Sequence, residues 1–160
     1  MRRIGRSFLR RDDAVTEVIG YVLSFALSAI FLLIALNVFS TARGNTEHVV
    51  TGVELRTLAD RVASRIVEMG LVSQEFPNAT MQVSLVIPQS LNGKLYTITA
   101  TAASVRAETN DGSVSAAATT YRTEALPGIV VSGAVDSSNE RLKLLYQPDG
   151  AARRIQILEE

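Results

Sequence analysis

Apolar and polar positions divide the chain into three stretches with different periodicities. The first is an almost unbroken apolar run of 22 residues, 18–39, that contains no charge. Across residues 47–70, apolar side chains recur mainly every three or four residues with charged residues between them, which predicts an amphipathic helix. From Met81 onward the period changes to two, as in β-strands with one buried face.

The apolar run is long enough to cross a membrane. A helix rises about 1.5 Å per residue, so this run spans a hydrocarbon core of roughly 30 Å. The residues that follow are of ordinary polarity and too few to enclose such a helix completely. We therefore expect a transmembrane helix over residues 15–42. A cleaved secretory signal is an alternative, because the small residues Ser40-Thr41-Ala42 follow the run.

A tract of weak helix formers, Arg43-Gly44-Asn45-Thr46, separates this run from the amphipathic helix, which we place at residues 43–72. An isolated glycine costs a helix about 1 kcal/mol, which makes a break here plausible. Either one helix continues through Gly44 with a kink, or two helices join there. Asn45 or Thr46 suits a helix start, and Gly70 suits the C-cap.

Turn signals divide the remaining segment, residues 73–160, into five to seven expected antiparallel strands. Asn92-Gly93 is a strong hairpin signal between β-patterned residues 82–87 and 95–100. Three further turn signals are Asn110-Asp111-Gly112, Pro127-Gly128 and Pro148-Asp149-Gly150. The predicted fold class is therefore α+β, with the amphipathic helix packed on a small antiparallel sheet.

Charge is distributed unevenly, although the whole chain has zero formal net charge at pH 7. Residues 1–14 carry five arginines against Asp12 and Asp13, a net charge of +3, so the remainder carries −3. By the positive-inside rule, this leader stays in the cytoplasm and residues after about 42 lie outside the membrane. No domain positions the arginines on a nucleic acid, so we expect no nucleic-acid partner.

Residues that usually carry catalysis or bind metals are scarce. The chain has no Cys and a single His, His48, so a usual His/Cys zinc site cannot form within one chain. The acidic pairs Asp12-Asp13 and Glu159-Glu160 lie in the leader and at the C-terminal end, and no phosphate-binding fingerprint occurs. We predict no enzymatic activity, cofactor or metal, with calcium binding by Asp111 or Asp136 left open.

Three features on or after the apolar helix are candidate sites. Gly20, Ser24 and Ser28 repeat every four residues on one face, a spacing that permits close helix packing but is common in any membrane helix. Glu17 lies near the start of the helix, where the helix dipole favours a carboxylate by about 0.3–1 kcal/mol. Asn78-Ala79-Thr80 is an N-glycosylation acceptor sequence.

The tract Asp13-Ala14-Val15-Thr16 resembles the class III signal peptide of archaeal type IV pilins and archaellins. The continuation from Val15 to Gly20, VTEVIG, is similar to the euryarchaeal pilin start VSPVIG, with Glu17 where proline is common. The resemblance covers about the first 40 residues. It implies that a membrane-embedded prepilin peptidase cuts between Ala14 and Val15 and removes the basic leader.

The resemblance also implies a pilin-like architecture, in which the helix leaves the bilayer and packs in a filament core while its second half lies on an extracellular β-domain. Glu17 would then pair with the new α-amino group of Val15 on an adjacent subunit. The implied partners are the membrane, the peptidase, an assembly platform with its ATPase, and other pilin subunits.

The expected function is that of a type IV pilin-like subunit, which assembles into, primes or caps an extracellular filament for adhesion or motility. The alternative is a single-span membrane protein whose extracytoplasmic β-domain binds a ligand or an envelope partner. Major pilins, minor pilins and archaellin-like subunits are not separated by the sequence.

Overall fold

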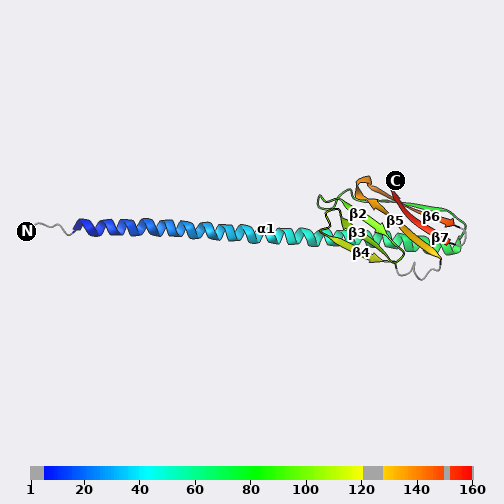
Figure 1. Cartoon of the computed structure of the whole chain (residues 1–160), viewed down its shortest axis with the longest axis horizontal. Coiled ribbons are helices and arrows are strands. Elements are labelled where there is room, and N and C mark those ends of the chain that lie inside the picture. The colour runs from blue at the N-terminus through cyan, green and yellow to red at the C-terminus, as the bar shows by residue number, and fades with distance from the viewer. Residues whose placement is uncertain (1–5, 121–127, 150–151, 160) are drawn as a thin grey trace, which may run out of the picture. The chain divides into compact units, whose positions relative to one another are not determined.

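The structure is a computed structural model of the chain (Figure 1). It describes the backbone of residues 6–120, 128–149 and 152–159, and the side chains of residues 15–120, 128–148 and 153–159. The chain divides into two compact units, residues 1–45 and 46–160. The main elements are α1 (Arg6–Glu75), β1 (Met81–Val86), β2 (Tyr96–Ala100), β3 (Ser104–Thr109), β4 (Ser115–Thr119), β5 (Ile129–Asp136), a 3-10 turn η1 (Ser137–Asn139), β6 (Arg141–Asp149) and β7 (Ala152–Glu159).

α1 is one continuous helix, so of the two alternatives at residues 43–46 the chain follows the one in which a single helix continues through Gly44. The cost of Gly44, about 1 kcal/mol, does not outweigh the hydrogen bonds of the helical turns on either side. The predicted start at Asn45 or Thr46 and the predicted C-cap at Gly70 are wrong, because all three residues lie inside α1. The helix ends at Glu75 instead, since proline at position 77 disfavours helical backbone at the residue before it.

The seven strands form one mixed sheet in the order β1-β6-β7-β5-β2-β3-β4. β5 belongs to both halves of this sheet. Its residues 129–132 pair with β7, and its residues 133–136 pair with β2. We call β1, β6, β7 and the first half of β5 the β6–β7 wing. The second half of β5 with β2, β3 and β4 is the β2–β3 wing.

The α+β class is confirmed, and so is the predicted turn at residues 110–112, which lies between the antiparallel strands β3 and β4. The expected terminal hairpin is present as the antiparallel pair β6–β7, but Pro148 and Asp149 belong to β6, where they pair with Arg153 and Ala152. β5 begins directly after Gly128, as expected, while Pro127 and Gly150 lie outside the described residues.

Two predictions about strand pairing are wrong. The segments on either side of Asn92-Gly93 do not pair with each other as strands: β1 pairs with β6, β2 pairs with β3 and β5, and an isolated bridge from Leu91 to Lys94 closes the tight turn. The sheet is also not purely antiparallel, because β5 and β7 run parallel. Period-two patterning identifies the buried face of a strand but does not encode its partner.

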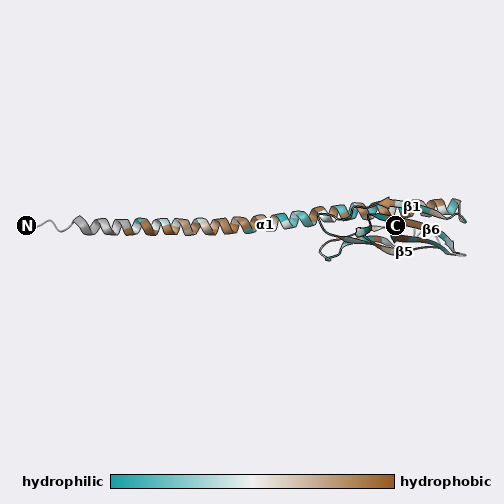
Figure 2. Cartoon of the chain, turned by 90° about the horizontal axis from the view of Figure 1, so that it is seen from above, coloured by the Kyte–Doolittle hydropathy of each residue, from teal (hydrophilic) through white to brown (hydrophobic). Residues whose placement is uncertain are grey.

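Within residues 46–160, α1 lies along one face of the sheet (Figures 1 and 2). Its apolar stripe is buried against the strands, while its other side carries the charged residues. The largest fully buried side chains of this core are Tyr96, Tyr146, Leu55, Ile66, Ile98, Leu142, Leu144, Ile155 and Ile157. Helix and sheet therefore form the two layers of a single hydrophobic core.

Gly133 lies where β5 changes from one wing to the other. Its φ of 134° is in the region that side chains with a Cβ rarely adopt. A Cβ here would collide with the backbone of Ile157 in β7. Glycine is therefore required by both the conformation of β5 and the close approach of β7.

Candidate functional site

The apolar segment of α1 has no cover within its own chain. Sixteen large apolar side chains between Val15 and Phe39 are each more than half exposed, with Phe25 at 77% and Phe31 at 70%. By length and composition, α1 from Val15 onward is able to cross a membrane, and no part of its apolar window is buried. This surface requires an apolar environment outside the chain, such as lipid or other helices.

Two hydroxyl groups, one inside this segment and one just after it, are hydrogen-bonded within the helix. The Ser28 hydroxyl donates to the carbonyl oxygen of Ser24 at 2.8 Å, and the Thr41 hydroxyl donates to that of Asn37 at 3.0 Å. Such bonds to the preceding turn satisfy a hydroxyl without water. These hydroxyl groups therefore do not require water, and the segment is suited to an apolar environment.

The proposed packing stripe lies open on the helix. Gly20, Ser24 and Ser28 are exposed, and a Cβ added at Gly20 would meet nothing within 4 Å. Packing within the chain therefore does not explain the glycine. Small side chains here leave room for a neighbouring helix.

The residues of the predicted cleavage site lie inside α1. The backbone of Ala14 and Val15 is helical, and the Val15 side chain is 57% exposed. Glu17 is exposed, and its Oε1 accepts a hydrogen bond from the Tyr21 hydroxyl at 3.5 Å, the long end of the range for such bonds. This contact holds the carboxylate only weakly, so it is accessible to another partner.

Asn78 lies in the turn that follows α1, and its side chain is exposed. The turn is closed by a hydrogen bond from the Ala79 N–H to the carbonyl oxygen of Phe76 at 3.2 Å. His48 is exposed on α1, near the start of the second unit. Asn78 is thus accessible for modification, and no second residue of catalytic type is bonded to His48 in the described contacts.

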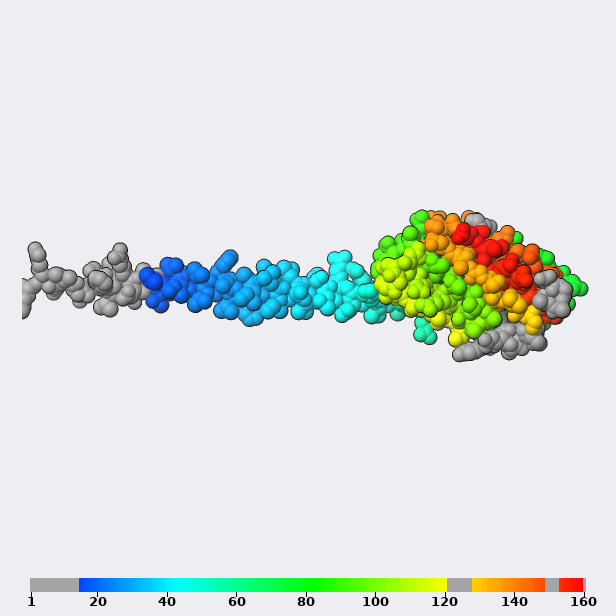
Figure 3. Space-filling view, viewed as in Figure 1, coloured from blue at the N-terminus to red at the C-terminus, as the bar shows by residue number. Residues whose placement is uncertain are grey.

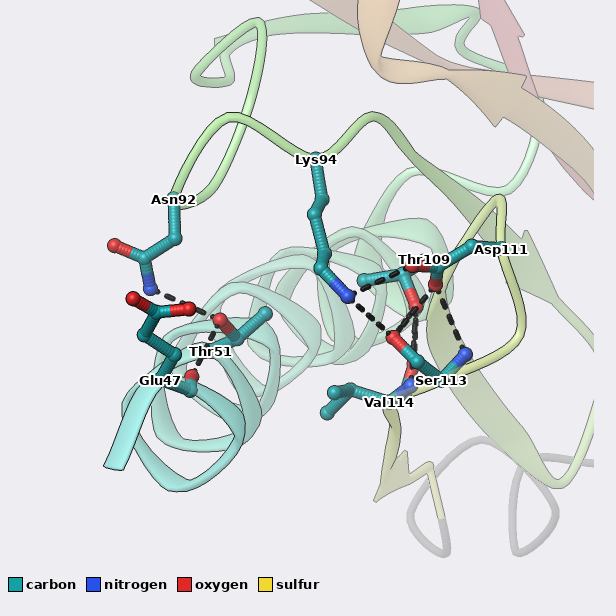
Figure 4. Close-up of polar contacts among 8 residues, drawn as sticks. All are labelled: Glu47, Thr51, Asn92, Lys94, Thr109, Asp111, Ser113 and Val114. Atoms are coloured by element: carbon teal, nitrogen blue, oxygen red, sulfur yellow. Dashed lines mark hydrogen bonds and ion pairs between the residues drawn. The ribbon is translucent and has the colours of Figure 1, made fainter. Parts of the chain in front are cut away.

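A hydrogen bond that the sequence did not predict joins the Asn92-Gly93 turn to α1 (Figure 4). The Asn92 side-chain amide donates to the Thr51 hydroxyl at 2.9 Å, and that hydroxyl donates to the carbonyl oxygen of Glu47 at 2.8 Å. Thr51 is buried, at 2% exposure. The turn therefore secures a loop to the helix and does not join two paired strands.

Figure 4 also shows Lys94 reaching across to the turn between β3 and β4. Its Nζ lies 2.7 Å from Asp111 Oδ2 and 2.7 Å from the Ser113 hydroxyl. The Lys94 ammonium and the bonds from Ser113 hold the pKa of Asp111 well below its usual range. Asp111 is thereby committed to stabilising the turn.

The other turn carboxylate, Asp136, caps η1. Its Oδ1 accepts the Ser138 N–H at 2.9 Å, and its Oδ2 accepts the Asn110 amide at 3.1 Å. These bonds, the one from Ser138 first, lower the pKa of Asp136. Among the residues whose side chains are described, no group of three His, Cys, Asp or Glu residues could hold a metal ion.

A hollow of about 480 Å³ lies where α1 meets β4. It is lined by Asp60 and Glu68 of α1 and Thr119 of β4, among others. Arg65 binds Glu68 at 2.6 Å, and both side chains are about half exposed. The hollow thus contains no paired acid and base of catalytic type in its described lining.

Comparison with protein families gives a match over most of the chain. A model of DUF7266, described as a family of unknown function, matches residues 10–157. No curated protein and no solved structure matches the chain. Because the match runs from the end of the basic leader through the apolar segment to the last strand, the chain belongs to the DUF7266 family.

Proposed function

We propose that this chain is a type IV pilin-like structural subunit, inserted in the membrane by α1 and assembled into, or priming or capping, an extracellular filament. The observation that carries this proposal is the apolar segment of α1, which is exposed around its whole circumference. A filament core and a lipid bilayer would both cover this apolar surface. The cleavage pattern at Ala14-Val15 then favours transfer from bilayer to filament.

The proposed orientation places the arginine-rich leader in the cytoplasm and the β-domain outside. Prepilin peptidase would cut between Ala14 and Val15, and the assembly platform with its ATPase would extract the mature subunit. Removal of five arginines leaves a chain whose apolar helix begins near its N-terminus. The basic leader then no longer holds the helix at the cytoplasmic surface, and Glu17 and the new α-amino group of Val15 are the charges that remain at its start.

Glu17 and the small-residue stripe have separate proposed roles in assembly. Gly20, Ser24 and Ser28 support the approach of a neighbouring helix, because none of them projects a large side chain. Glu17 would fix the register between neighbouring helices. Its carboxylate is held only by a long contact with Tyr21 and is therefore available to the new amino group of a neighbouring Val15.

Intact-mass measurement on protein from the native host tests the processing step. The expected chain begins at Val15, and a chain that keeps residues 1–14 in cells with active peptidase would refute the proposal. Ala14→Ile should block the cut by enlarging the residue before it. The matched variant Ala42→Ile should leave processing intact, because position 42 would matter only to an ordinary secretory signal.

A second variant tests assembly apart from processing. Glu17→Gln keeps the shape of the side chain and removes its charge, so we expect normal cleavage but a reduced yield of filaments. Filament yield equal to that of the unmodified chain would end the pairing hypothesis. Glu47→Gln is the control, because Glu47 is an exposed carboxylate on α1 beyond the apolar segment.

The position of the cut supports an alternative function. Ala14 and Val15 lie within α1, and peptidases generally act on extended backbone, so cleavage requires local unwinding of the first turns. A chain that is never cut would act as a single-span membrane protein, with its β-domain binding a ligand or an envelope partner. The intact-mass experiment separates these two functions directly.

A further inference from the structure

The outer face of the β6–β7 wing is basic. Arg141 and Lys143 of β6 and Arg154 of β7 alternate with the fully buried positions of their strands, so they lie on the side of the sheet away from α1. Figure 3 views the domain toward this outer face, with β6 and β7 in orange and red. On the β6–β7 wing, none of the described outward side chains is acidic, and Arg141 and Lys143 have no ion-pair partner among the described residues. The nearest outward carboxylate of β5 is Asp136, in the other half of that strand.

Each of these cations lies opposite an exposed apolar residue on the neighbouring strand. The three cross-strand pairs are Arg141 with Val86, Lys143 with Leu158, and Arg154 with Val130. The apolar members are 72%, 39% and 48% exposed, respectively. The result is a face of alternating charge and apolar surface, to which the aliphatic stems of the basic side chains also contribute.

A surface of complementary character lies at the C-terminal end of α1. Leu71, Val72 and Phe76 are 47%, 43% and 55% exposed. Glu68 and Glu75 lie on the same helical turns and are exposed, and no Lys or Arg occurs from residue 66 to residue 93. Glu68 is paired with Arg65 at 2.6 Å, so Glu75 is the carboxylate of this surface without a described ion pair. The unpaired carbonyl groups at the end of a helix add negative potential. We call the three apolar residues and the two glutamates the α1 end patch.

The two surfaces belong to the two different layers of the domain. The sheet turns its outer face away from α1, and the end patch is on the part of α1 that the sheet leaves exposed. Contact between two such surfaces joins the front of one copy to the back of the next. In an interface of this type, one end of the assembly leaves the basic face free and the other end leaves the end patch free. The assembly therefore extends into an open chain unless it closes into a ring.

We infer that a second copy of this chain docks the outer face of its β6–β7 wing on the α1 end patch. Arg141 and Lys143 meet the carboxylate of Glu75, and three exposed apolar residues on each side bury one another. The interface deepens the proposed function, since it supplies a contact between β-domains that continues from subunit to subunit. It does not require cleavage at Ala14-Val15, because copies still anchored in the membrane can also form it.

Disulfide cross-linking tests this contact without background, because the chain has no cysteine. The full chain carrying both Leu71→Cys and Leu158→Cys is oxidised in native membranes. We expect a ladder of covalent oligomers, and none from either single variant. The matched control replaces Leu158→Cys with Thr99→Cys, which is exposed on the β2–β3 wing, and should cross-link at the level of random collision.

Charge reversal gives the second arm of the test. Lys143→Glu in the double-cysteine chain should reduce cross-linking about fivefold, and adding Glu75→Lys should restore it, because coupled charges across an interface compensate each other. Rising salt should weaken cross-linking of the parent chain. Glu54→Lys, on an exposed position of α1 outside the end patch, should not restore it.

Three outcomes would overturn the inference. The first is a ladder no stronger than that of the control, and the second is dimers from a single-cysteine variant. The third is a Lys143→Glu variant that loses binding to anionic vesicles or to an acidic polymer while its cross-linking is unchanged. N-terminal mass is measured on the same samples. If uncut chains cross-link, the proposed interface stands and the pilin function is refuted. If cut chains do not cross-link, the interface is refuted and the pilin function stands.

Discussion

Gly133→Ala tests the division of the sheet into two wings. The new Cβ would meet the backbone of Ile157, which cannot move aside as a flexible side chain can. An unfavourable backbone conformation costs about 1–3 kcal/mol, and forcing extra volume into a packed site costs about 1–3 kcal/mol more. We therefore expect the variant to lower the free energy of unfolding by about 4 kcal/mol.

Gly112→Ala is the matched control. Gly112 also has a positive φ, 69°, but a Cβ there would meet nothing within 4 Å. Its cost is therefore the conformational part alone, about 1 kcal/mol. The comparison isolates the contribution of the contact between β5 and β7.

Urea unfolding of the full chain in detergent micelles measures both variants. Near-ultraviolet circular dichroism of the buried tyrosines, Tyr96 and Tyr146, reports on the packing of the β-domain. Small domains have about 5–15 kcal/mol of stability in total, so Gly133→Ala should fold but unfold at clearly lower urea. Equal midpoints for Gly133→Ala and Gly112→Ala would refute the proposed close approach of the two strands.

Three further predictions use the same titration. Ile66→Ala leaves a cavity between α1 and the sheet and should cost about 2–5 kcal/mol, whereas Val53→Ala, at a position 61% exposed, should change stability by less than about 0.5 kcal/mol. The pKa of Asp111 is lower in the folded chain than in the unfolded chain, so its stabilisation is present above the unfolded pKa of about 4 and is lost as the pH falls. Asp111→Asn should therefore reduce the acid dependence of the urea midpoint, and an unchanged profile would contradict the contact with Lys94. Burial raises the pKa of Tyr96 to about 12. Its neutral form therefore contributes stability that is present below the unfolded pKa of about 10 and is lost as the pH rises toward 12. Tyr96→Phe should make the urea midpoint less dependent on pH in this window.

Local patterns predicted the elements well because each depends on nearby residues. The apolar face of α1, the turn at residues 110–112 and the pairing of the neighbouring strands β6 and β7 require only periodicity and turn chemistry. Strand partners depend on contacts distant in sequence, and for this reason Asn92-Gly93 was misinterpreted as the centre of a two-stranded hairpin. Its asparagine instead bonds to Thr51, a residue 41 positions earlier.

The candidate site divides in the same way. The apolar segment and its small-residue stripe are visible in the sequence, because composition and spacing define them. The role of Gly133 depends on where β7 lies, and the basic face depends on which strands are neighbours. An isolated glycine within a strand pattern is the one sequence signal for the role of Gly133, and no local signal marks the basic face.

The strand order has a consequence for how the β-domain forms during synthesis. β1 pairs with β6, and the first half of β5 pairs with β7, so both earlier segments lack a partner until the last two strands have been made. Pairings this distant in sequence form slowly, since the intervening chain must be ordered first. The β6–β7 wing therefore cannot form until β7 emerges, and a chain interrupted before β6 exposes β1 and the first half of β5 without their partners to proteases and chaperones.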